Sequence, residues 1–361
     1  MVEEALPELL THFAQLSDPR AENASHKLAD ILAIAICAVM SGADSFVEME
    51  QYGRGKQAWL GSFLALPNGV PSHDTFRRVF MLLDAEAWQG VFLDWTRKLV
   101  SQTPAVLAEV LAVDGKWSRA SGLHTVSVWA SEQHVVLAQR QVPDKTNEIT
   151  AIPELLEGLD LAGTTVTMDA AGTQKQIAWV IREHHADYVL ALKANHKHLF
   201  EDVRWLFAQD NSPPHRSSHN RGHGRNEARD VWLLSDLSFL TDVAAWRDLA
   251  GVARVRGTRT VNGELSVHDR YFLTSLTDAD RLAHAVRSHW GIENGLHWIL
   301  DVAFRDDQSS TRAAHAQANL VTLRHLALTQ LEREPSLRAS VRAKRMRSGW
   351  DDDYLLKVLY A

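Results

Sequence analysis

Several things that this sequence lacks set the first limits on what it can be. It has one cysteine, Cys37, in 361 residues, which excludes an internal disulfide and favours a reducing, cytoplasmic setting. Its longest apolar run, residues 31–40, falls far short of the roughly 20 residues that a membrane-spanning helix needs. Residues 1–4 carry two glutamates where a secretory signal would be basic. We therefore expect neither a disulfide scaffold nor a membrane contact.

Common catalytic motifs are missing as well. The sequence contains no Gly-x-x-x-x-Gly-Lys-Ser/Thr phosphate loop, no Gly-x-Ser-x-Gly elbow and no Rossmann glycine fingerprint. Cys37 lies on the apolar face of a predicted helix, so we expect it in the core and not as a nucleophile. Nucleotide hydrolysis by a phosphate loop, serine hydrolysis and dinucleotide chemistry are thereby disfavoured.

The chain also lacks an excess of positive charge. Its 38 Lys and Arg stand against 45 Asp and Glu, a formal net charge of −7. Binding to a polyanion must therefore depend on local patches. Two stretches are basic: residues 216–229, here called the first basic tract, and residues 333–347, the C-terminal basic tract. Either one can equally be a solvated surface.

What is present indicates a globular protein of two or three units. Hydrophobic residues make up 45% of the chain and charged residues 23%. In residues 1–100, apolar side chains recur at helical spacing, which predicts an all-α N-terminal domain. Its segment 75–80, with two arginines, is either a helix that binds in a nucleic-acid groove or a packing helix whose arginines are in solvent.

From about residue 108 the pattern becomes that of a mixed sheet flanked by helices. Strands are expected near 110–113, 125–129, 135–138, 165–168 and 188–192, with helices near 148–159 and 174–183. Residues 205–276 predict a β-rich insertion, and helical periodicity returns at 278–289 and 313–331. The expected division is 1–100, 101–204, 205–276, 277–332 and a basic C-terminal segment, 333–361.

Two carboxylates follow apolar strands in this pattern. Asp114 and Asp169 each come just before a turn of small residues. The carboxyl ends of strands are where α/β sheets bind ligands, and carboxylate oxygens suit a hard divalent ion such as Mg²⁺. Each Asp can instead merely cap the turn or helix that follows. A pair of ions would call for a third carboxylate.

A third carboxylate lies in the segment 287–302. If this segment is helical, His289, Glu293 and His297 fall on one face. Zinc is one alternative for this face, although the spacing is not that of the His-Glu-x-x-His proteases. Another is that the histidines make structural hydrogen bonds and that Glu293 pairs with Arg287 or Arg312.

Several motifs taken together resemble a known family. The most specific is His289-Trp290 with Ile292-Glu293-Asn294 and Leu296-His297-Trp298. The others are Asp18-Pro19-Arg20, Gly69 to Phe80, Asp114-Gly115-Lys116, Lys145 with Asn147-Glu148-Ile149, Asp169-Ala170 with Gln174, Asp187 to Lys193, and His223-Gly224-Arg225 with Arg229. Almost from end to end, the chain resembles the DDE transposases of bacterial insertion sequences, in the ISAs-type branch that includes the H-repeat-associated proteins.

The resemblance implies an RNase H-like core in which Asp114, Asp169 and Glu293 form the catalytic, metal-binding triad. Two Mg²⁺ ions are implied, with Mn²⁺ as a substitute. The implied reaction is DNA cleavage at the ends of an insertion sequence and strand transfer of the freed 3′-OH into target DNA. Double-stranded DNA is the expected partner, a homodimer on DNA the expected assembly, and the nucleoid the expected place in the cytoplasm.

Other side chains are expected to hold the scissile phosphate or flanking DNA, although surface roles remain open for the lysines. They are Lys116, Lys193, Arg225, Arg229, Arg287, His289, His297, Arg342, Lys344 and Arg345.

The sequence also departs from the family in places. Trp117 and Ala120 alter the usual run after Asp-Gly-Lys, and residues 194–196 stand where Gly-Asn-Gln is common. His289 and Leu300 occupy positions where the wider superfamily has Arg and Lys. These departures affect the supporting contacts and not the triad. A cut-only nuclease and a domesticated DNA-binding protein of the same fold remain the rival hypotheses.

Overall fold

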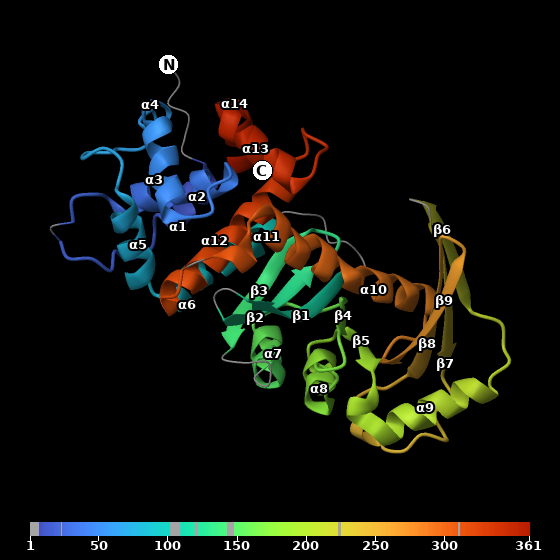
Figure 1. Ribbon diagram of the computed structural model, residues 1–361. Helices are drawn as coiled ribbons and strands as arrows, with labels where there is room; N and C mark the ends of the chain where they lie inside the picture. Colours follow the sequence, from blue (N-terminus) through green and yellow to red (C-terminus); the bar gives the residue numbers. More distant parts are fainter. Residues whose placement is uncertain are drawn as a thin grey trace.

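The computed structural model describes residues 7–22, 24–101, 109–119, 122–142, 148–222, 225–309 and 311–361. Over these residues the chain is a mixed α/β protein in which many helices surround one large mixed sheet (Figure 1). Four motif residues, together with Ala120, fall outside these ranges: Lys145, Asn147, His223 and Gly224. Among the described helices, none has the length and apolar character needed to cross a membrane.

Within the described ranges the sheet has nine strands in the order β3-β2-β1-β4-β5-β9-β8-β7-β6. They are β1 (Val110–Ser118), β2 (Leu123–Ala130), β3 (Val135–Val142), β4 (Thr165–Met168), β5 (Asp187–Leu192), β6 (Arg216–Gly222), β7 (Arg225–Leu234), β8 (Gly251–Val261) and β9 (Glu264–Thr274). The neighbours β1, β4 and β5 run parallel, and the other pairs are antiparallel. The carboxyl ends of β4 and β5 therefore lie at one edge, alongside the middle of β1.

The insertion does not form a sheet of its own. After helix α9 (Lys197–Gln209), the strands β6 to β9 follow as a meander, and β9 pairs antiparallel with β5 from Val189↔Thr274 to Leu192↔Tyr271. The expected β-rich segment thus extends the central sheet. Its outer end is open to solvent, since every residue of β6 is exposed.

Helices cover both faces of the sheet (Figure 1). On one face α7 (Glu148–Glu157), α8 (Lys175–Glu183) and α9 share a hydrophobic core with Leu111 and Val113 of β1. On the other face lie α10 (Ala279–Gly291), a π-helical segment, Ile292–His297, α11 (Trp298–Ala303) and α12 (Ala314–Arg333). Because strand side chains alternate between faces, Val110 and Ala112 face this second group.

The N-terminal and C-terminal helices pack together. The described part of residues 7–101 contains the helices α1 to α6, and its buried side chains form one hydrophobic core with those of α12, α13 and α14. These helices are α1 (Glu8–Phe13), α2 (Leu28–Met40), α3 (Phe46–Gly55), α4 (Gln57–Leu60), α5 (His73–Leu82), α6 (Ala85–Ser101), α13 (Val341–Trp350) and α14 (Asp352–Leu359). Figure 1 shows α13 and α14 beside α2 and α3. The division of the chain at residues 100 and 333 stays a prediction.

Helix α10 is fixed to the sheet at its first turn. The Asp278 side chain accepts hydrogen bonds from the main-chain N–H groups of Asp280 and Arg281, at 2.7 and 3.0 Å. The Arg281 guanidinium then donates to Asp187 Oδ2 at 3.0 Å and to Thr165 Oγ1 at 3.3 Å, at the beginnings of β5 and β4. This anchoring sets the direction in which α10 runs across the sheet toward residue 293.

Candidate active site

Strand pairing places the two aspartates side by side. In the parallel pair β1–β4, Val113 lies opposite Met168, so Asp114 and Asp169 are the next residues on neighbouring strands. Both are on the α10 face, because Asp169 follows Thr167, whose side chain contacts α10, with the two-residue period of a strand. The expected juxtaposition of the two carboxylates is therefore present.

The surroundings of the two aspartates differ from the expectation in one respect. β1 continues to Ser118, so Asp114 lies within the strand and not at its end. The reason is that β2 goes on pairing with β1 from Asp114↔Ser127 to Ser118↔Leu123 after β4 has ended. Asp169 does begin a turn, where its carboxylate accepts from the N–H groups of Ala171 and Gly172 at 2.9 and 3.2 Å.

Glu293 lies in the π-helical segment between α10 and α11. The segment 287–302 is helical as expected, but its middle turn is wider than an α-helix. Such π turns are often found at functional sites because they change which side chains share a face. Glu293 is exposed and, among the described residues, its carboxylate has no hydrogen-bond or ion-pair partner. It is thus available to a ligand.

The charges around Asp114 show that the three carboxylates influence one another. Burial, followed by Asp169, Glu148 and Glu293 as repelling carboxylates, raises the pKa of Asp114 to about 7. The main-chain N–H of Gly115, which donates to Asp114 at 2.9 Å, acts in the opposite direction. A divalent cation would stabilise such a group of mutually repelling carboxylates.

The two histidines on either side of Glu293 contact the strands that carry the aspartates. His289 Nδ1 lies 3.0 Å from Thr167 Oγ1, and His297 Nδ1 lies 3.7 Å from Asp114 Oδ2. Burial lowers the pKa of His289 to about 4 and that of His297 to about 3. Both rings are therefore neutral at pH 7 and can contact a phosphate only as hydrogen-bond donors.

A second acidic group lies close by, but a cation already occupies it. Oxygens of Asp301, Asp306 and Asp307 all lie within 4.8 Å of one another. The Lys116 ammonium lies 2.6 Å from Asp301, 3.7 Å from Asp307 and 4.0 Å from Asp306. Arg324 pairs with Asp306 as well. The expected DNA contact of Lys116 is thus replaced by an internal ion-pair network.

A buried pair of residues under β1 was not expected from the sequence. His124 and Glu148 are 3% and 5% exposed and are hydrogen-bonded through His124 Nε2 and Glu148 Oε1. A Cβ atom at position 115 would overlap both side chains, so the glycine after Asp114 is required for this packing. Asp114-Gly115 and Glu148 both belong to motifs that resemble the family, but nothing in the sequence indicated that they are in contact.

Comparisons with known proteins agree with this geometry. A family model described as "Transposase DDE domain" matches residues 89–329, and one described as "DDE_Tnp_1-associated" matches residues 10–96. This chain belongs to the DDE transposase family. It is 34% identical over 374 aligned positions to "Putative transposase YncI" of Escherichia coli O157:H7, covering 98% of this chain and 95% of that protein.

Two further relatives match this chain. "H repeat-associated putative transposase YhhI" of Escherichia coli K12 is 32% identical, with 98% of both chains covered. "Uncharacterized protein in dhlA 3'region" of Xanthobacter autotrophicus is 41% identical over 285 residues, covering 75% of this chain and 96% of that one. The expected H-repeat-associated branch of the family is thereby confirmed.

The remaining side chains expected to meet DNA lie in two places on this transposase. Lys193 is exposed just after β5, next to the loop in which Asn195 Nδ2 donates to Ala170 O at 2.6 Å. Arg229 lies on the face of β7 that is turned toward α10, and Arg287 lies on α10 itself. Arg225 begins β7.

In the C-terminal basic tract the expectation was wrong for two residues. Lys344 is 5% exposed, and its ammonium donates to the carbonyls of Leu331 and Glu334 at 2.7 and 2.6 Å. Arg345 is 3% exposed and donates to Asp44 Oδ1 at 2.9 Å and to main-chain carbonyls. Neither side chain can reach DNA, whereas Arg342 is exposed.

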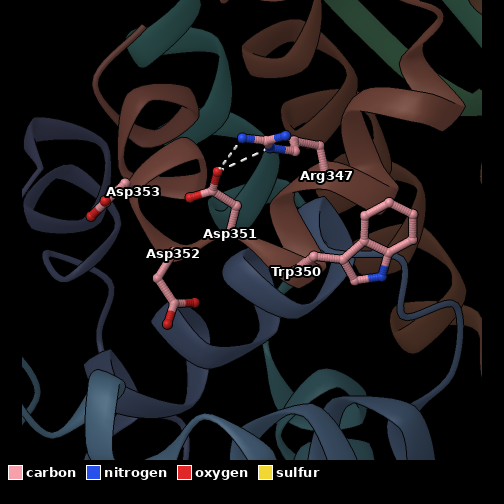
Figure 2. A pocket seen from close by; sticks show the side chains of 5 residues that line it. All are labelled: Arg347, Trp350, Asp351, Asp352 and Asp353. Carbon is pink, nitrogen blue, oxygen red and sulfur yellow. Dashed lines mark hydrogen bonds and ion pairs between the residues drawn. The ribbon is translucent and has the colours of Figure 1, made fainter.

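A surface hollow of about 430 Å³ lies at the junction of α13 and α14 and includes none of the three proposed carboxylates. Figure 2 shows Arg347 bound to Asp351 there, with Trp350 beside them. Asp352 pairs with Lys56 at 2.7 Å. Because these acidic side chains are largely satisfied within the protein, the hollow is no second candidate site.

Proposed function

We propose that this transposase cuts DNA at the ends of its insertion sequence and transfers the freed 3′-OH into target DNA. Asp114, Asp169 and Glu293 would form the metal-binding, catalytic triad of that reaction. The observation that carries the proposal is the position of two carboxylates on adjacent parallel strands under the helix that bears the third. The family supports the same reaction class.

The donor set fits a hard divalent cation. Carboxylate oxygens are the ligands that Mg²⁺ prefers, and the pKa of Asp114 is raised by burial first and by the neighbouring carboxylates second. We propose Mg²⁺ as the ion, with Mn²⁺ as a substitute and two ions held between the three residues. When bound, such ions supply activation of the attacking hydroxyl and stabilisation of the leaving oxygen.

The protein's own groups would position this chemistry. The neutral His297 ring, 3.7 Å from Asp114, limits how that carboxylate can turn. His289, held by Thr167, lies between Asp169 and the insertion and can donate to a phosphate oxygen. Salt-sensitive backbone contacts would come from Lys193, Arg225, Arg229 and Arg287, which reconciles DNA binding with a net charge of −7. We further propose a homodimer on paired double-stranded DNA ends, acting at the nucleoid.

The test is an end-cleavage and strand-transfer assay with duplex DNA that borders the gene. Glu293→Gln should lower Mg²⁺-dependent cleavage by more than about 100-fold, because losing a direct ligand exceeds the typical 10- to 100-fold effect of an outer partner. End binding should be retained. Glu201→Gln, at an exposed position of α9, is the matched control and should cleave normally.

The outcomes separate the rival functions. Undiminished cleavage by Glu293→Gln would refute the assigned triad. Cleaved ends without joined products would indicate a cut-only nuclease. Specific end binding without cleavage by the wild-type protein, in Mg²⁺ or Mn²⁺, would indicate a DNA-binding protein that has kept the fold.

A further inference from the structure

Arg270 of β9 is stacked on an exposed tryptophan near the triad. Its guanidinium carbon lies 4.8 Å from the centroid of the Trp290 ring, on α10. Trp290 is 43% exposed and comes three residues before Glu293 in the sequence. A guanidinium over an indole face keeps its N–H groups directed outward, free to donate to a ligand.

No carboxylate neutralises this arginine. Among the described residues, Arg270 has no hydrogen bond or ion pair. The adjacent acid, Asp269, points to the opposite face of the strand, where it binds Arg256 through two hydrogen bonds of 2.7 and 2.8 Å. An arginine that is oriented but unpaired is well prepared for an external anion.

Two other cations, Arg229 and Arg287, belong to the same side of the sheet as Arg270. Arg229 of β7 lies opposite Gly257, which in turn lies opposite His268, two residues before Arg270. Burial and the nearby Arg229 both lower the pKa of Arg270. Arg287, three residues before Trp290, reaches the amide of Asn220 on β6, at 3.2 Å. Arg229 is partly neutralised by Glu227, 3.1 Å away on the same strand, and a phosphate would stabilise the cations of this face further.

This cationic surface is continuous with the triad. The pKa of His289 is lowered mainly by burial, and Asp169 raises it while Arg270 lowers it further. The same ring contacts Thr167 on β4, two residues before Asp169. His289 thus links Arg270 to the strand that leads to Asp169.

We propose that Arg270 binds a backbone phosphate of the DNA strand next to the one held at Asp114, Asp169 and Glu293, and that Trp290 is the residue that positions it. This inference rests on the proposed function for its reaction, but the phosphate contact can be measured by binding alone. A planar guanidinium binds two phosphate oxygens at once, which an ammonium cannot do. Stacking on Trp290 orders the Arg270 guanidinium before DNA binds and so lowers the entropic cost of binding.

The experiment measures DNA binding at several salt concentrations, and cleavage, on the bordering duplex. Arg270→Ala should lower the slope of log affinity against log salt by about 0.9, the value for one phosphate contact. Arg270→Lys should keep the salt slope but lower the cleavage rate at saturating DNA several-fold, because an ammonium cannot bind two phosphate oxygens in the way a guanidinium does. Trp290→Ala should give a similar cleavage defect, and Trp290→Phe, which keeps an aromatic face, should restore most of the rate.

Arg256→Ala is the matched control. It removes an arginine from the same pair of strands but from the opposite face, and it should leave slope and cleavage unchanged. A wild-type slope for Arg270→Ala, or an equal change in Arg256→Ala, would overturn the proposal. If wild-type protein fails to cleave while Arg270→Ala still changes the slope, the proposed reaction is wrong and the phosphate site stands.

Discussion

The two basic tracts of this transposase look alike in sequence and have opposite fates in the structure. In the first basic tract, β6 is exposed at every position, and Arg216 and Arg229 make only partly exposed ion pairs with Asp280 and Glu227. In the C-terminal basic tract, Lys344 and Arg345 are buried. A run of cations therefore does not by itself identify a DNA-binding surface.

The ends of other helices explain the difference. Lys344 donates to the last turn and the end of α12, at Leu331 and Glu334. Arg345 donates to Val39 near the end of α2 and to Ala303, the last residue of α11. Helix C-termini present unpaired carbonyls and a partial negative charge, so they can hold buried cations. Among the described residues, no helix C-terminus accepts hydrogen bonds from the arginines of β6, which is an edge strand.

Arg345→Met should give the largest effect within this comparison. It leaves Asp44 and several carbonyls without their partner in the interior, and losing one side of a buried ion pair costs about 3–5 kcal/mol. Urea unfolding should show a free energy of unfolding that is lower by this amount. Unchanged stability would mean that the buried position assigned to Arg345 is wrong.

Lys344→Met should have the next largest effect. Two carbonyls at the end of α12 lose their donor, while the buried charge is removed with it, so we expect a loss of about 2 kcal/mol. Thermal unfolding measures the change. DNA affinity of the folded fraction should be unaffected, and a reduced salt slope with normal stability would place Lys344 on the surface after all.

The paired substitution Arg229→Ala and Arg287→Ala should show the reverse behaviour. Loss of two phosphate contacts would lower the salt slope of DNA binding by about 1.8 and affinity by roughly tenfold or more. Stability should change by less than about 0.5 kcal/mol, as is usual at surface positions. A large loss of stability would show that arginines of the first basic tract also support the fold, as Lys344 and Arg345 of the C-terminal basic tract do.

Arg342→Ala should give the smallest effect. Its side chain is exposed on the helix that buries its two basic neighbours, so stability should stay within about 0.5 kcal/mol of wild type. If Arg342 contacts one phosphate, the salt slope falls by about 0.9 at most. An unchanged salt slope would show that Arg342, the remaining DNA-binding candidate of the C-terminal basic tract, does not contact DNA.

Much of the site could be predicted because its signals are local. An apolar run that ends at Asp114 or Asp169 predicts a strand and its polar end, and helical spacing places Glu293 between two histidines. The length of β1, the π-helical turn at Glu293 and the His124–Glu148 pair could not be predicted. Each depends on pairing or packing between segments that are remote in sequence.

By itself, the sequence determined the order of helices and strands, the three carboxylates and the absence of a disulfide, because periodicity and residue type act over a few neighbouring positions. The tertiary structure alone decided that the insertion continues the central sheet through β5 and β9, and which cations face solvent. The physical reason is that a charge is buried only where distant main-chain carbonyls or carboxylates converge to satisfy it, and that convergence is a property of the folded chain.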